Sequence, residues 1–167
     1  MTKKLTILFA PIDGFGHVNA CIGVAEVLRD RGHRIVFIIN KSWKGKLTKY
    51  GFEEELFTDP TRKENENPAE FITDFLLDSG MLSPLSPLEK MKRMWSSGTN
   101  VMLNQIKEND PIIKLIVDKV KPDVIVIDHA GCTPSLVNAG VPWVWLVSTN
   151  PLFAIWDDRT PPCGSGN

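Results

Sequence analysis

The 167-residue sequence has few cysteines and almost no net charge. Its three cysteines, Cys21, Cys132 and Cys163, are too few and too widely spaced for a disulfide framework or a zinc cluster, and this pattern is typical of a reducing compartment. The net charge of -1 argues against a nucleic-acid-binding protein, which normally carries a clear excess of basic residues. We therefore expect no nucleic-acid partner.

Long apolar stretches are also absent from the sequence. No segment approaches the ~20 apolar residues that a membrane-spanning helix needs. The first apolar run follows Lys3 and Lys4, as in a signal peptide, but it ends at Pro11 and no small-residue cleavage site follows it. These features predict a cytoplasmic protein with no membrane partner.

Two common nucleotide-binding signatures are incomplete or missing. Gly14 and Gly16 begin a Gly-x-Gly-x-x-Gly pattern, but Asn19 stands where the third glycine belongs. Asn40, rather than an acidic residue, ends the second predicted strand. The incomplete dinucleotide fingerprint disfavours a hydride-transfer enzyme, and no Walker sequence is present.

The apolar residues that are present occur in continuous runs. Runs of this kind are typical of strands covered on both faces, as in a parallel sheet. We expect strands at residues 5–10, 35–39, 52–57, 123–127 and 141–147. After the first strand, a helix that ends at Gly32 carries one buried stripe, which consists of Val18, Cys21, Ile22, Ala25 and Leu28.

Further helices have recognisable first residues. Ser42 is expected to cap a short helix that Gly51 closes. Proline at the first helical position predicts starts at Asn67-Pro68-x-Glu70, Ser86-Pro87-x-Glu89, Asp110-Pro111 and Thr133-Pro134, the third helix running to about Lys121. The order of elements predicts an α/β fold, a Rossmann-like doubly wound parallel sheet with a helical insertion at about residues 60–110.

The turn after the first strand delivers His17 to the first turn of a helix. With the usual strand order 3-2-1-4-5, the first and fourth strands are neighbours, and ligands of such sheets bind at the carboxyl ends beside this point. Asp128 ends the fourth strand, so we expect it to meet His17 there. A carboxylate that holds one imidazole nitrogen leaves the other free to take a proton from a bound hydroxyl.

Simpler interpretations remain open for these residues. His17 and Asp128 could each cap a local turn, and His129 could line the crevice or support it. Asp13, His17, Asp128 and His129 could in principle hold a metal, although we expect none. In the insertion, methionines and aromatic side chains favour a pocket for an apolar ligand, while part of the set simply packs as a helical core.

Three segments together resemble a known family. Residues 14–19 (GFGHVN), 122–128 (PDVIVID) and 160–166 (TPPCGSG) are similar, in this order, to motifs in the N-terminal half of UDP-glycosyltransferases. The resemblance covers nearly the whole chain. It implies one half of a GT-B fold, in which residues 1–167 form the N-terminal acceptor-binding domain and a C-terminal domain, not found in this chain, binds the nucleotide sugar.

The resemblance also implies roles for individual residues. His17 would be the general base, with Asp128 as its partner, in an inverting transfer from a UDP-sugar co-substrate to a small lipophilic acceptor, without a cofactor or metal. Acceptor-binding residues would be Ile12, Phe15, Phe75, Met81, Met94 and Phe153, and donor-side contacts Gly16 and Asn19. This chain alone is then expected to be inactive. The alternative is a non-catalytic binding module for a hydrophobic small molecule.

Overall fold

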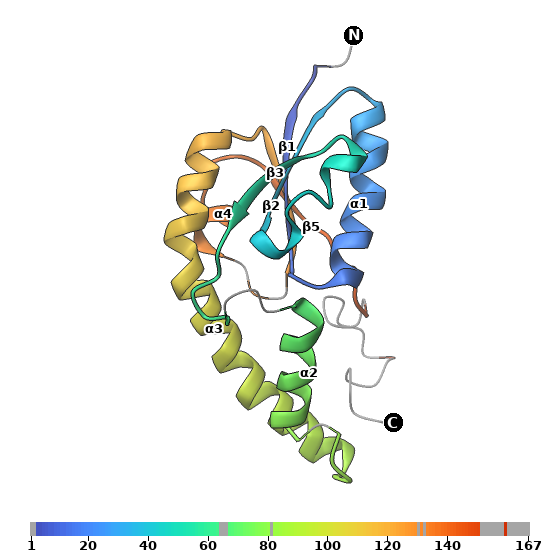
Figure 1. The fold of residues 1–167 in the computed structure, drawn as a ribbon, viewed down its shortest axis with the longest axis vertical. Helices are drawn as coiled ribbons and strands as arrows, with labels where there is room; N and C mark the ends of the chain where they lie inside the picture. The colour runs from blue at the N-terminus through green and yellow to red at the C-terminus, as the bar shows by residue number, and fades with distance from the viewer. Residues whose placement is uncertain are drawn as a thin grey trace.

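The computed structural model describes residues 3–63, 67–80, 82–129, 131, 133–150 and 159. Within these residues five parallel strands form one sheet in the order β3-β2-β1-β4-β5 (Figure 1). This confirms the predicted strand order. The strands are β1 (Thr6–Pro11), β2 (Arg34–Asn40), β3 (Glu53–Phe57), β4 (Val124–Asp128) and β5 (Trp143–Trp145).

Helices cover both faces of this sheet. Helix α1 (Phe15–Asp30) lies on one face, and the second half of α3 (Pro87–Val120) lies on the other with the short helix α4 (Pro134–Val137) (Figure 1). The predicted stripe on α1 is confirmed, since Val18, Cys21, Ile22 and Ala25 are buried and Leu28 is partly buried against the same core. The fold is therefore α/β and doubly wound, as predicted.

Alternate residues of the central strands build the two core layers. Ile7 and Phe9 of β1 pack toward α1, whereas Leu8 and Ala10 pack toward α3. Strand residues point alternately to opposite faces, so a strand buried on both sides must be apolar throughout. This explains why the runs in the sequence are continuous.

The predicted helix start at Asp110-Pro111 is wrong. Pro111 lies inside α3, which runs unbroken through 34 residues. Proline removes one backbone N–H, but the helix continues because its last turns bury Ile113, Ile116 and Val117 against the sheet. Asp110 caps a different helix: its Oδ1 accepts a hydrogen bond from the Ser135 backbone N–H of α4 at 2.8 Å.

Removing this contact between α3 and α4 should lower the stability of the domain. Thr133, the N-cap of α4, makes no side-chain cap hydrogen bond, so Asp110 supplies that bond from α3. Asp110→Ala should destabilise the domain by about 1 kcal/mol, as for the loss of an N-cap. Urea unfolding measures the change in the free energy of unfolding, and amide hydrogen exchange at Ser135 measures the loss of the hydrogen bond itself. Asp118→Ala, which removes only an exposed pair with Lys114, is the control, and equal losses in both variants would contradict this role.

The region between β2 and β3 also differs from the prediction. It forms two 3₁₀ turns, η1 (Lys41–Trp43) and η2 (Thr48–Tyr50), rather than one helix. Ser42 is not the cap, because the side chain of Asn40 accepts a hydrogen bond from the Ser42 backbone N–H at 3.0 Å. Gly51 does end η2, with the positive φ of 77° that favours glycine.

Helix α2 (Pro68–Asp78) and the first half of α3 extend past the carboxyl ends of the strands (Figure 1). We call them the helical arm. Both predicted capping boxes are present, Asn67 with Glu70 and Ser86 with Glu89. None of the helices in the described ranges combines the length and apolar character that crossing a membrane would require.

Candidate active site

His17 lies in the first turn of α1, which begins a few residues after the end of β1. The N-cap Gly14 has an extended backbone, which any residue can adopt, so its backbone conformation does not require glycine. Gly16 is exposed, and a Cβ there would meet nothing within 4 Å. The site therefore has open space beside the backbone at Gly16, and His17 stands next to it.

The structure brings His17 and Asp128 together. Nδ1 of His17 lies 3.0 Å from Oδ2 of Asp128, and the two side chains are 23% and 4% exposed. Their meeting follows from the sheet, because Pro11 is in register with Asp128 and the Ile12 backbone N–H donates to the Asp128 carbonyl at 2.9 Å. A buried carboxylate at Nδ1 favours the tautomer whose Nε2 can accept a proton.

Ser148 is a third member of this group and was not among the predicted site residues. Its hydroxyl donates to Oδ2 of Asp128 at 2.6 Å and lies 2.9 Å from Nδ1 of His17. Its backbone N–H donates to Oδ1 of Asp128 at 3.3 Å. A polar residue just past β5 was the available signal, because β5 pairs with β4 and brings its carboxyl end to the same edge.

Hydrogen bonds of the His17 ring to the described residues all run through Nδ1. Nε2 is therefore the nitrogen left for a ligand. With Nδ1–H directed at Asp128 and Ser148, this nitrogen carries a lone pair and can accept a hydroxyl proton. The group has the chemistry of a general base held in one tautomer.

His129 lies next to this group without joining it. Its Nδ1 accepts a hydrogen bond from the Gly131 backbone N–H at 2.9 Å. Burial lowers the pKa of the His129 ring below its ordinary value, because the charged form loses hydration. His129 is thus a neutral, half-buried neighbour of the His17 pair.

The lowered pKa of His129 predicts how stability depends on pH. The unfolded chain takes up the proton first, so the contribution of the neutral ring is complete above the unfolded value of about 6.5 and is lost as pH falls through the folded pKa. The urea concentration at the unfolding midpoint of the wild type should decrease as the pH is lowered from about 7.5 to about 5.5. His129→Gln should fall less over this range, and an equal fall would contradict the prediction.

The metal alternative gains no support. Asp13 turns away from His17 toward Trp43 and Arg62. In the described part of the chain no three His, Cys, Asp or Glu side chains gather as a metal site would need.

The predicted acceptor residues lie in different surroundings. Phe75 lines a groove of about 340 Å³ between α2 and α3, together with Phe71 and Val101, and we call it the arm groove. Phe15 is 46% exposed and its ring lies 5.0 Å from that of Trp43, at the rim of the His17 turn.

Of the other predicted site residues, those that the structure describes do not line the arm groove. Ile12 and Met94 are half-buried, and Asn19 is exposed on α1. Met81 and Phe153 lie outside the described residues. A second hollow, of about 590 Å³, lies along α3 and is lined by Met91 and Trp95 among others. His17 lines neither hollow.

Two solved glycosyltransferase structures share this architecture. The glycotransferase of kitacinnamycin superposes with a TM-score of 0.61 and 16% sequence identity, over 89% of this chain and 31% of its own. CalG4, the calicheamicin glycosyltransferase, gives 0.52 and 19%, over 86% of this chain and 30% of its own. The chain has the fold of one half of a GT-B glycosyltransferase. No protein-family model matches the sequence, and a search of curated proteins finds no match.

The GT-B likeness is one of fold, and it concerns one domain. The chain spans about a third of the length of the two glycosyltransferases. In this GT-B half, the His17 group lies at the carboxyl ends of β1, β4 and β5, where open α/β sheets bind their ligands.

Proposed function

We propose that this chain is the acceptor-binding half of an inverting UDP-glycosyltransferase. The reaction would transfer a sugar, with glucose as the first candidate, from a UDP-sugar to a hydroxyl of a small lipophilic molecule. Such acceptors include alcohols and phenols that a cell detoxifies by conjugation. The observation that carries the proposal is the contact of His17 with Asp128 at the switch point of a GT-B half.

The His17 group suggests how the reaction proceeds. Nε2 of His17 takes the proton of the acceptor hydroxyl while Asp128, at Nδ1, stabilises the imidazolium that forms. The acceptor oxygen bonds to the anomeric carbon from the side opposite UDP, and the bond from that carbon to the UDP oxygen breaks. UDP leaves with the electron pair, so the configuration of the sugar inverts.

The donor site is expected outside these residues. We propose that Gly16 and Asn19, both exposed at the start of α1, face the nucleotide sugar when a second domain presents it. The acceptor would reach from the helical arm to His17, with Ile12, Phe15, Phe75 and Met94 along its path.

Binding by the chain itself tests this division of labour. Titrating the chain with a panel of phenols, read by tryptophan fluorescence, should give saturable binding, whereas UDP-glucose at the same concentrations should give none. Tight binding of UDP-glucose by this chain would contradict the proposal. Joined to a nucleotide-sugar-binding domain, the chain should convert α-linked UDP-glucose to a β-glucoside, and an α-glucoside product would exclude inversion.

The alternative function is a non-catalytic binding module. The arm groove favours it in one respect, since His17 does not line that groove. A module of this kind would bind the same phenols, but its affinity and any turnover of the joined protein would not depend on His17.

A further inference from the structure

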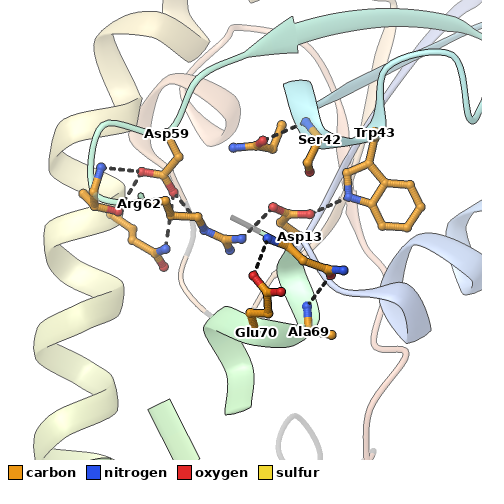
Figure 2. Close-up of polar contacts among 11 residues, drawn as sticks. Asp13, Ser42, Trp43, Asp59, Arg62, Ala69 and Glu70 are labelled. Atoms are coloured by element: carbon orange, nitrogen blue, oxygen red, sulfur yellow. Dashed lines mark hydrogen bonds and ion pairs between the residues drawn. The ribbon is translucent and has the colours of Figure 1, made fainter. Parts of the chain in front are cut away.

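A nearly buried charge cluster lies between the His17 turn and the helical arm. Asp13, Arg62 and Asp59 form it, and their side chains are 13%, 9% and 7% exposed (Figure 2). Nη1 of Arg62 donates to Oδ2 of Asp13 at 2.8 Å, and Nε lies 3.5 Å from Oδ2 of Asp59. We call these three residues the Asp–Arg–Asp cluster. The mechanism proposed above does not use them.

The cluster fixes one side of the turn that carries His17. Asp13 lies four residues before His17 and accepts a second hydrogen bond, from Nε1 of Trp43 at 2.5 Å (Figure 2). The other side of the turn is held by the Ile12 backbone N–H, which donates to Asp128. Because the N-cap Gly14 has no side chain to cap α1, Asp13 supplies the side-chain anchor of this turn.

The same cluster reaches both helices of the arm. The guanidinium of Arg62 lies over the ring of Phe71 in α2, 4.2 Å from its centroid. Oδ2 of Asp59 accepts a hydrogen bond from Nε2 of Gln105 in α3 at 3.3 Å. Phe71 also forms part of the wall of the arm groove, so contacts run without a gap from that groove to Arg62 and on to Asp13.

A purely structural role does not account well for this arrangement. Nearly buried ion pairs usually add little stability, because desolvation offsets the attraction between the charges. Two carboxylates share one guanidinium here, and burial raises the pKa of Asp13 against the lowering effect of Arg62. The cluster instead fixes the orientation of the Asp13 carboxylate, because the guanidinium of Arg62 and the indole of Trp43 each donate a hydrogen bond to it.

We propose that Asp13 and Arg62 are positioning residues for His17, which tie the orientation of its ring to the arm groove. The inference rests on the proposed role of His17 as the base. The anchored turn then keeps Nδ1 of His17 directed at Asp128. A change at Phe71 in the groove wall would alter the orientation of the His17 ring through Arg62 and Asp13. Neither residue is proposed to touch the acceptor.

Nuclear magnetic resonance of the histidine side chains in this chain tests the proposal. Ring ¹⁵N shifts at about pH 9, above the ordinary imidazole pKa of about 6.5, report the ratio of the two neutral tautomers of His17. Arg62→Met should change this ratio by about three- to tenfold relative to wild type, with Arg62→Lys in between. Phe71→Ala should change it in the same direction.

Matched variants separate positioning from general destabilisation. Arg34→Met breaks an exposed pair with Glu53, and Val101→Ala changes another residue of the groove wall. Neither should move the His17 shifts. Unchanged His17 shifts in Arg62→Met would overturn the proposal, as would an equal change in Arg34→Met. If Arg62→Met does not fold, Arg62→Lys and Asp13→Asn decide by the same criterion. No sugar transfer is needed, so this result is independent of whether the proposed activity is found.

Discussion

Replacing His17 with alanine, in this chain joined to a nucleotide-sugar-binding domain, should lower kcat by about 100- to 10,000-fold, the usual contribution of a general base. The acceptor oxygen would then have to attack while still protonated. The His17 side chain is partly exposed. Because the proposed mechanism has it contact the acceptor only through the reacting hydroxyl, KM for the acceptor should change little. Product formation from UDP-glucose and a phenol, followed by chromatography, measures both constants.

Variants around His17 make this result specific. Asp128→Asn should also lower kcat strongly, because an amide at this position no longer enforces the Nδ1–H tautomer. His33→Gln is the control: it removes a histidine at the other end of the sheet, whose Nδ1 accepts a hydrogen bond from Leu5. Unchanged kcat in His17→Ala would remove the base assignment and favour the non-catalytic binding module.

Phe37→Ala should destabilise the domain by about 3–5 kcal/mol, the cost of emptying a large buried aromatic site. Phe37 of β2 is fully buried, with ring centroids 5.1 Å from Phe9 and 5.3 Å from Phe52. A domain of this kind is stable by only about 5–15 kcal/mol, so the loss would be a large share of the total. Equilibrium unfolding in urea, followed by fluorescence and circular dichroism, measures it.

Leu115→Ala is the matched control for this core substitution. Leu115 lies on α3, which packs on the sheet, but its side chain is 70% exposed. The change in the free energy of unfolding should stay within about 0.5 kcal/mol. If both variants lost the same stability, the stacked aromatic layer would not be the centre of the core.

The sheet and the His17 pair could be predicted because their signals are strong and independent. Strands buried on both faces require continuous apolar runs, and right-handed crossovers leave few possible strand orders. Once β1 and β4 were neighbours, the turn that follows β1 and the end of β4 had to lie at the same edge of the sheet. His17 and Asp128 could therefore be paired across 111 positions without knowledge of any side-chain geometry.

The errors arose where tertiary contacts outweigh local signals. Asp110-Pro111 looks like a helix start, but burial of the residues after it carries α3 through the proline, and Asp110 caps α4 instead. Asn40, which ends β2 two residues before Ser42, supplies the cap in its place.

Two polar contacts, that of Ser148 with the His17 pair and that of Arg62 with Asp13, carry no sequence motif of their own. Ser148 reaches the His17 pair only because β5 lies beside β4. The sequence pattern around β5 does not distinguish this serine from any other small polar residue. Arg62 and Asp13 are 49 positions apart, and Arg62 follows an edge strand in a charged loop that is typical of a solvated surface. Their pairing depends on the path of the loop between β3 and α2, which brings Arg62 to Asp13.

The position of a bound phenol relative to His17 tests the central claim most directly. A crystal structure of this chain with a bound phenolic acceptor should place the phenol oxygen about 2.6–3.2 Å from Nε2 of His17, within hydrogen-bonding reach of the base. The aromatic body of the acceptor should lie toward the helical arm. An acceptor that binds in the arm groove with its hydroxyl pointing away from His17 would contradict the assignment of His17 as the base.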